Sequence, residues 1–332
     1  MRNRLTQNYL KWIKTLMLTG VGIALFYFAV RNQNWGNFRA IISGGTYYNV
    51  FGIVLVSYAS YWFRTKRWKL LLHAAGKEAS FVHSISALSV SYMINYAIPR
   101  LGELTRCYII RRREGVPFEL SLGTVIMERL VDIAVLGLVV SAALLLQFKQ
   151  LFGFAKTNIY QPIREKIGSA EIPLHYILLI FVIVVVLYFI VQKISKWKSG
   201  QLQLHSFVDG LKSIRQVKSK RQFALYTAGI WTCYFLMTYL WAFSFTETEN
   251  ISPLQAFVVM VAGTLGRSLP IQGGGFGAYH FMVTQTLLIY GITEQAGFAL
   301  AVLIHGGQMV FSLLMGLAGY FYLMFTEKKI NS

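Results

Sequence analysis

Long uncharged hydrophobic runs alternate with short basic or polar stretches along almost the whole of this 332-residue chain. A helix needs about 20 residues to cross the hydrocarbon core of a bilayer. Runs near or above that length recur, so we predict an all-α, polytopic integral membrane protein with about six full spans. The predicted spans cover residues 13–30, 47–63, 119–146, 174–191, 223–245 and 296–325.

Two other hydrophobic segments contain helix-breaking residues. Pro99 and Gly102 interrupt residues 81–113, and a similar break at 270–277 divides residues 254–290. If 81–98 crossed the membrane, the three arginines at 111–113 and the later basic stretches would face outward, against the usual charge rule. We therefore predict that 81–113 is a re-entrant helical hairpin entered from the cytoplasm. For 254–290, a hairpin and two full crossings fit the charges equally well.

These two broken segments occupy corresponding places in two halves of the chain, about 1–147 and about 173–325. The first half starts inside and the second starts outside, a pattern typical of the inverted-topology repeats of transporters. We expect one domain over 1–332, with the substrate site where the two broken helix pairs meet.

Composition and charge narrow the class further. The chain is 55% hydrophobic, its mean hydropathy is +0.50 and its formal net charge is +19. The basic residues lie in blocks beside hydrophobic runs, so we expect them to orient the protein in the cell inner membrane with both termini cytoplasmic. We also expect them to contact anionic inner-leaflet lipids rather than nucleic acid. The basic stretch 193–222 is interpreted either as an amphipathic helix on the inner leaflet or as a connector docked on the domain.

Glu128, Arg129 and Asp132 carry the strongest chemical signal because they lie inside a predicted span. Glu128 and Asp132 are four residues apart and share a helix face. Two bare carboxylates there would repel each other, so a cation must lie close or one acid must be protonated. Arg100, Arg106 and Arg267 are the candidate cations. A charge in this position is a functional hypothesis by default, and the alternative is a buried ion pair that fixes helix packing.

The arginines around the first break suggest phosphate chemistry. Arg100, Glu103 and Arg106 follow Pro99, and a guanidinium group offers a bidentate fork for a lipid phosphate. Glu103 and Arg106 are three residues apart, so a purely structural network is the alternative.

The second break contributes glycines and histidines. Gly273, Gly274, Gly275 and Gly277 precede a helix, whose N-terminal amides favour an anion. A flexible tip or close helix packing explains the glycines equally well, and their spacing fits no nucleotide motif.

His280 and His305 follow in hydrophobic surroundings, where they act as hydrogen-bonded core groups, as a proton relay or as headgroup contacts. The sequence contains no HExxH motif or CxxC pair, so we predict no metal, disulfide or other cofactor.

Several of these motifs together resemble the lysylphosphatidylglycerol synthase transmembrane family, the flippase-like membrane region of the multiple peptide resistance factor. Order and spacing agree over nearly the whole chain. Where the family often has Arg-Glu after the glycine loop, this chain has Tyr279 and His280. The matching residues are Pro99, Arg100, Gly102, Glu103 and Arg106, then Arg112, Glu114, Gly115 and Val116, then Glu128, Arg129 and Asp132, then Pro270 with the glycines of 273–277.

The resemblance implies a protein that moves a lipid or lipid-linked precursor with an anionic headgroup between leaflets. The basic and acidic residues above would then bind phosphate and act as counter-charges or proton carriers. Full-length synthases add a cytosolic aminoacyltransferase domain, so we expect no lysyl transfer from this chain. The alternatives are an intramembrane lipid-modifying enzyme that uses Glu128, Asp132 and His280, or a membrane partner of a separate glycosyltransferase or aminoacyl-lipid synthase.

Overall fold

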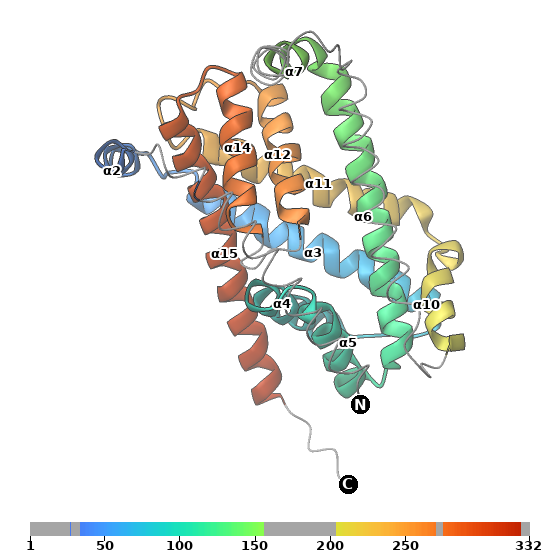
Figure 1. Ribbon diagram of the computed structural model, residues 1–332. Coiled ribbons are helices and arrows are strands. Elements are labelled where there is room, and N and C mark those ends of the chain that lie inside the picture. The colour runs from blue at the N-terminus through green and yellow to red at the C-terminus, as the bar shows by residue number, and fades with distance from the viewer. Residues whose placement is uncertain (1–26, 28–33, 156–203, 270–274, 327–332) are drawn as a thin grey trace, which may run out of the picture. The chain divides into compact units, whose positions relative to one another are not determined.

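The computed structural model describes residues 27, 34–155, 204–269 and 275–326 (Figure 1). The chain divides into two compact units, one formed by Met1–Val140 with His205–Ser332 and the other by Ser141–Leu204. Most of the second unit lies outside the described residues. The site discussed below belongs entirely to the first unit.

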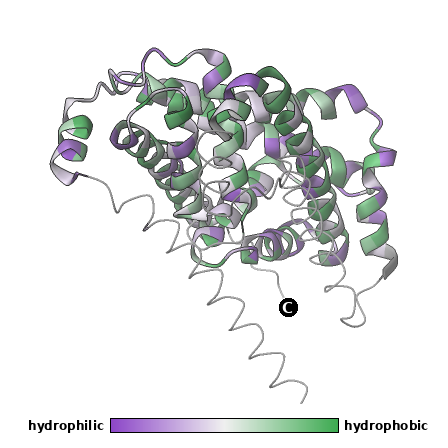
Figure 2. Ribbon diagram, turned by 45° about the horizontal axis from the view of Figure 1, so that its top comes forward, coloured by the Kyte–Doolittle hydropathy of each residue, from purple (hydrophilic) through white to green (hydrophobic). Residues whose placement is uncertain are grey.

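The described residues form helices and no strand, which confirms the predicted all-α class. Hydrophobic residues run along the long helices, with hydrophilic ones interspersed (Figure 2). The helices are α2 (Trp35–Gly44), α3 (Val50–Ala74), α4 (Phe81–Ala97), α5 (Leu101–Glu114), α6 (Phe118–Leu146), α7 (Phe148–Ala155), α10 (Leu204–Gln216), α11 (Lys220–Ala242), α12 (Pro253–Ser268), α14 (Ala278–Ile289) and α15 (Glu294–Phe325).

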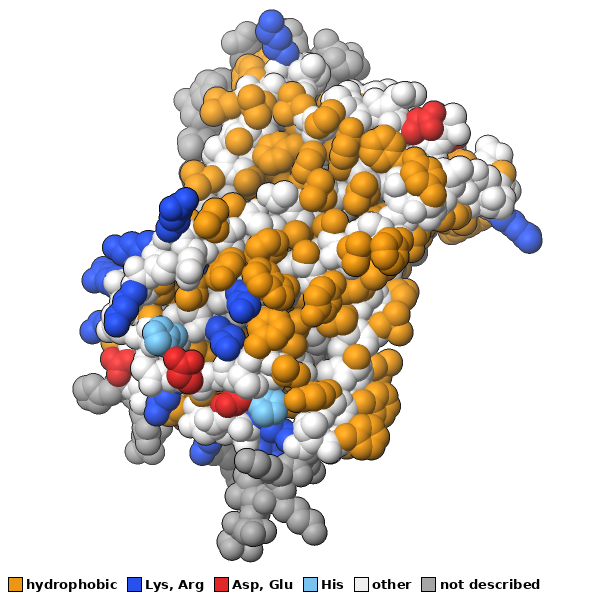
Figure 3. All heavy atoms as spheres, turned by 180° about the vertical axis from the view of Figure 1, so that it is seen from behind, with side chains coloured by type: hydrophobic (Ala, Val, Ile, Leu, Met, Phe, Trp, Pro, Cys, Tyr) orange, Lys and Arg blue, Asp and Glu red, His pale blue; other side chains and the backbone are white. Residues whose placement is uncertain are grey.

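Among the described residues, three helices are long and apolar enough to cross a membrane, namely α6, α11 and α15. They match three of the predicted spans to within a few residues. The predicted spans at 13–30 and 174–191 lie outside the described residues, apart from Tyr27. Figure 3 shows hydrophobic side chains over much of one face, and exposed leucine, phenylalanine and tyrosine residues line α6 and α15. This surface suits contact with lipid tails.

Helix α3 extends beyond the predicted second span. The span predicted from the sequence covers residues 47–63, and the helix continues without a break to Ala74. Arg64 and Arg67 lie within it and are buried. These two arginines have carboxylate partners on α6, so their charges are paired inside the protein.

The connection between the first two predicted spans also contains a helix that the sequence did not predict. The side chain of Asn34 caps the start of α2 by accepting hydrogen bonds from the backbone N–H groups of Gly36 and Asn37. Asparagine is among the preferred residues at this capping position.

Helices α4 and α5 pack against each other as a hairpin with its turn at Pro99 and Arg100. Gly102 is required there, because a Cβ atom at this position would lie 2.0 Å from the backbone oxygen of Ser91. The Gly102 N–H donates a hydrogen bond of 2.8 Å to the side-chain oxygen of Asn95. The sequence therefore fixes both the turn and the close approach of the two helices.

Helices α12 and α14 form the second pair. Helix α12 begins with Pro253 behind a capping box, in which Ser252 and Gln255 each bond the other's backbone N–H. A Cβ atom on Gly266 would lie 2.9 Å from the backbone oxygen of Ala278. Close helix packing therefore accounts for Gly266.

The described part of the basic connector docks on the domain. Gly210 of α10 meets Gly123 of α6, and a Cβ atom on Gly123 would lie 2.4 Å from the backbone oxygen of Phe207. Nearby, Ile214 and Val217 pack with Leu71 of α3. Of the two interpretations of 193–222, docking on the domain holds for α10, and residues 193–203 lie outside the described residues.

Candidate functional site

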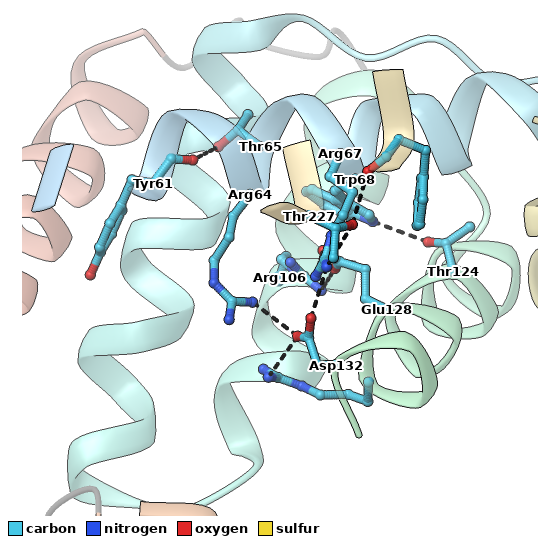
Figure 4. A network of polar contacts seen from close by, with 12 residues as sticks. Tyr61, Arg64, Thr65, Arg67, Trp68, Arg106, Thr124, Glu128, Asp132 and Thr227 are labelled. Carbon is cyan, nitrogen blue, oxygen red and sulfur yellow. Dashed lines mark hydrogen bonds and ion pairs between the residues drawn. The ribbon is translucent and has the colours of Figure 1, made fainter. Parts of the chain in front are cut away.

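Two acids on α6 face two arginines on α3 (Figure 4). Arg67 joins both acids, with Nη1 2.8 Å from Asp132 Oδ1 and Nη2 3.4 Å from Glu128 Oε1. Arg64 Nη1 donates a hydrogen bond of 3.2 Å to Asp132 Oδ2. The arginines are three residues apart and the acids four, so each pair lies on one face of its helix.

Arg106 brings the α4–α5 hairpin into this network. Its Nη2 lies 2.6 Å from Glu128 Oε2, and both side chains are only 4% exposed. The guanidinium group also lies over the ring of Trp68, 4.3 Å from its centroid. Trp68 in turn donates a hydrogen bond of 3.0 Å from Nε1 to Thr124 Oγ1. The buried cation is therefore held by a carboxylate on one side and by an aromatic face.

Arg129 forms the outer part of the network. Its Nη2 donates a hydrogen bond of 3.0 Å to Glu103 Oε1, and its Nη1 lies 4.0 Å from Asp132 Oδ2. The Arg129 side chain is 41% exposed, far more than Arg64, Arg67 or Arg106.

The network contains more positive than negative charge. Four arginines (64, 67, 106 and 129) face three carboxylates (103, 128 and 132), which leaves one positive charge in excess. Charges removed from water need both partners and good geometry, because an uncompensated buried charge is strongly destabilising. The excess positive charge of the network therefore favours the binding of an anion.

Two of these arginines also line a cavity of about 290 Å³. Arg64 and Arg129 reach it from α3 and α6, and Arg267 reaches it from α12. The other described lining residues are mostly hydroxyl or amide side chains: Ser57, Ser60, Tyr61, Tyr92, Asn95, Tyr96, Tyr234, Met237, Gln308, Phe311 and Ser312. Residues of six helices line the cavity, so side chains from both predicted halves of the chain meet there.

Arg267 is held by neutral groups. Its Nη1 donates a hydrogen bond to Gln308 Oε1, and its guanidinium group lies 4.6 Å from the centroid of the Tyr279 ring. Among the described residues, its Nε atom is buried and has no hydrogen-bond partner. This leaves a charged donor beside the cavity.

The predicted site residues therefore fall into separate groups. Glu103, Arg106, Glu128 and Asp132 belong to the network, Arg129 belongs to both network and cavity, and Arg267 lines the cavity. Arg267 was predicted as a counter-ion for the α6 acids, but it contacts the neutral side chains of Gln308 and Tyr279.

Arg100 starts α5 with a φ of 72° and does not line the cavity. A positive φ is uncommon for a residue other than glycine, so the turn imposes local backbone strain there.

The glycine loop is only partly described, since Gly273 and Gly274 lie outside the described residues. Gly275 and Gly277 have φ values of 85° and 84°, which favour glycine. A Cβ atom on Gly275 would also lie 2.8 Å from the Cα atom of Arg267. The loop therefore packs tightly against the end of α12 that carries the cavity arginine.

His280 and His305 are buried next to each other, with ring centroids 5.1 Å apart. His280 Nδ1 accepts a hydrogen bond of 3.4 Å from the Gly277 N–H. Neither ring lines the cavity. His280 thus supports the start of α14. The Tyr279 ring contacts both the His305 ring and the Arg267 guanidinium group.

Sequence reasoning missed Arg64 and Arg67, the principal partners of Asp132. A signal was present, because the α6 acids required nearby cations and these two arginines share one face of a long helix. It also missed Tyr92 and Tyr234, whose rings lie 5.9 Å and 5.5 Å from the Arg64 guanidinium carbon. Aromatic residues are so frequent in this chain that their positions alone did not distinguish them.

A comparison with known protein families shows the family to which the chain belongs. A family model for the lysylphosphatidylglycerol synthase TM region matches residues 13–316, nearly the whole chain. The chain belongs to this family. Its members are membrane proteins with a lipid-related function, which agrees with the apolar spans and the buried arginines. Among curated proteins and solved structures, no significant match was found.

Proposed function

We propose that this member of the lysylphosphatidylglycerol synthase TM family moves a lipid, or a lipid-linked precursor, with an anionic headgroup between the leaflets of the cell inner membrane. The observation that carries the proposal is the cavity lined by Arg64, Arg129 and Arg267, beside a network with an excess of positive charge. Arginine suits phosphate because its planar fork donates two parallel hydrogen bonds.

The second support is the length of the helices around the cavity. Helices α4, α5, α12 and α14 contain 17, 14, 16 and 12 residues. A full crossing takes about 20 residues, so each pair suits a re-entrant hairpin. Two such pairs in two halves fit an inverted repeat, in which broken helices hold the substrate near the middle of the bilayer.

The third support is the way in which the charges are held. Ionisable groups within a membrane are costly, and they mark substrate pathways when they face a polar cavity. Glu103 and Asp132 position Arg129 and Arg64 as counter-charges, while Arg106 and Glu128 tie the first hairpin to α6. A headgroup could occupy the cavity while its tails remain in lipid, with both termini on the cytoplasmic side.

The test is a leaflet-specific assay in liposomes. The full-length protein is reconstituted with tail-labelled phosphatidylglycerol, and a membrane-impermeant reductant bleaches the label in the outer leaflet only. We expect wild-type protein to expose the inner-leaflet label and Arg129→Gln to slow that step. Protein-free liposomes and Lys69→Gln, at a basic position of α3 outside the network and the cavity lining, serve as controls. Equal rates in protein-containing and protein-free liposomes would refute transport.

A further inference from the structure

Arg113 ties the open end of the α4–α5 hairpin to the last turn of α15. Its Nη1 atom donates a hydrogen bond of 2.9 Å to the backbone oxygen of Thr326, and its Nη2 atom donates to the backbone oxygen of Leu323. The last four carbonyl groups of a helix have no partner within that helix. A guanidinium group suits this position, because it is a cation at the negative end of the helix dipole and presents several donors at once. One side chain of α5 therefore completes the C-terminus of α15.

The next residue, Glu114, ties the same end of α5 to the start of α4. Glu114 Oε1 accepts a hydrogen bond of 3.0 Å from the backbone N–H of Ser80, and it contacts His83 Nδ1. The centroid of the His83 ring lies 6.1 Å from that of Tyr322 on α15. Two adjacent residues of α5 thus hold the start of α4 and the end of α15 together.

Between this point and the cavity, α4 and α15 pack against each other through glycines of α15 (Figure 1). A Cβ atom on Gly319 would lie 3.0 Å from the backbone oxygen of Ser86, and one on Gly316 would lie 2.4 Å from the Cβ atom of Met93. Neither glycine has a side chain that would block a shift of α15 along α4. Small sliding movements of packed helices are a known form of conformational change. The polar contacts at the end of this interface therefore decide whether the helices can shift.

The same two helices also form part of the cavity wall. Six of their residues line it, namely Tyr92, Asn95 and Tyr96 on α4 and Gln308, Phe311 and Ser312 on α15. At 1.5 Å per residue, Ser312 lies about 21 Å along α15 from Thr326. Helices are rigid enough to carry a displacement over such a distance. A shift of α4 against α15 at the Arg113 end would therefore change the shape of the cavity.

We infer that Arg113 acts as a latch, which holds the α4–α5 hairpin against the end of α15 and restricts access to the cavity. When Arg113 leaves the two carbonyl groups, α15 loses two hydrogen bonds from a charged donor, and the hairpin can shift along it. As a device that regulates transport, the latch rests on the proposed function. Its effect on access to the cavity can be measured without transport.

The reactivity of a thiol in the cavity wall tests the latch. Ser312→Cys places a thiol of similar size there, and the native Cys107 and Cys233 are buried, so the protein without this substitution supplies the background. Purified full-length protein in detergent is treated with an anionic methanethiosulfonate reagent, and mass spectrometry follows the labelling over time. We expect Arg113→Gln to raise the labelling rate about tenfold, because hydrogen bonds from a charged group are strong enough to shift an open–closed equilibrium by that factor.

Two matched variants separate a latch from a local loss of structure. Arg111→Gln removes an exposed charge from the same turn of α5 and should leave the labelling rate unchanged. Thr326→Val removes the hydroxyl that donates to the Tyr322 backbone oxygen, but it keeps the backbone oxygen that Arg113 contacts. This variant weakens the end of α15 without removing the latch, so its labelling rate should also stay unchanged.

The outcomes are distinct. An unchanged labelling rate in Arg113→Gln would overturn the latch. Equal acceleration by Thr326→Val would show that α15 frays at its end, and it would overturn the latch as well. If Arg113→Gln does not fold, Arg113→Lys keeps the charge without the planar fork and should raise the rate by a smaller factor. Faster labelling of Arg113→Gln in a protein that moves no lipid in liposomes would support the latch and refute only the proposed function.

Discussion

Arg106 and Glu128 form a buried ion pair of 2.6 Å that links the α4–α5 hairpin to helix α6. Glu128 uses its other oxygen for Arg67 of α3, so one carboxylate ties three elements together. The pair does not line the cavity, but its neighbour Arg129 does. The geometry therefore assigns Glu128 a positioning role: it holds the hairpin where the cavity arginines can act.

Replacing Glu128 by glutamine should destabilise the protein strongly. Glu128→Gln leaves Arg67 and Arg106 without this buried counter-charge, and breaking such a pair costs about 3–5 kcal/mol. Thermal or denaturant unfolding in detergent measures the change. Glu119→Gln, on the first turn of the same helix, is the matched control and should shift stability much less. Equal stability of both variants would contradict a structural role for the pair.

The sequence predicted the helices well because their signals are local. Long apolar runs, Pro253 with its cap, and the Pro99–Gly102 break each depend on neighbouring residues, and the observed bounds agree closely. The partners in the network are not local. Arg67 lies 61 positions from Glu128 along the chain, and only the packing of α3 on α6 brings them together. The basic run after the second predicted span therefore did not reveal that Arg64 and Arg67 are buried in ion pairs.

The contact between α6 and α10 should depend on two glycines. Gly123→Leu would force a side chain into the backbone of α10, because even a Cβ atom there lies 2.9 Å from Gly210 Cα. We expect faster proteolysis of the 204–216 segment and a lower unfolding midpoint. Gly137→Leu, on the same helix, is the control, because a Cβ atom there meets no heavy atom within 4 Å. Similar proteolysis of the two variants would argue against docking.

Lowering the pH should destabilise the open end of the α4–α5 hairpin, where Glu114 contacts Ser80 and His83 outside the candidate membrane spans. Burial raises the pKa of Glu114, but hydrogen bonds from His83 and Ser80 outweigh it and lower this pKa below its usual 4.5. A lowered folded-state pKa contributes stability above the unfolded pKa, and that contribution is lost as the pH falls through the folded value.

Unfolding midpoints measured at several pH values test whether the stability that Glu114 contributes is lost as the pH falls. Wild-type protein should exceed Glu114→Gln in stability at pH values above about 4.5, and the difference should shrink as the solution is acidified further. A difference that grows on acidification would contradict the assigned direction of the Glu114 shift.

Arg129 should affect lipid handling more than stability, because its side chain is 41% exposed while it lines the cavity. Arg129→Gln should lower the transport rate about tenfold, as expected for a lost charged hydrogen bond. Arg129→Lys keeps the charge but not the bidentate fork, so we expect partial activity. The liposome assay and an unfolding curve separate the two effects, and a large loss of stability with normal transport would contradict this division.

The central claim is that three arginines from three helices form one anion site inside the membrane domain. The most direct test is mass spectrometry of the lipids retained by the purified protein, compared with the lipids of the membrane from which it was extracted. We predict that wild-type protein is enriched in an anionic phospholipid or lipid phosphate, and that the Arg129→Gln, Arg267→Gln double variant loses this enrichment. Retained lipids that match the membrane composition in both proteins would contradict the claim.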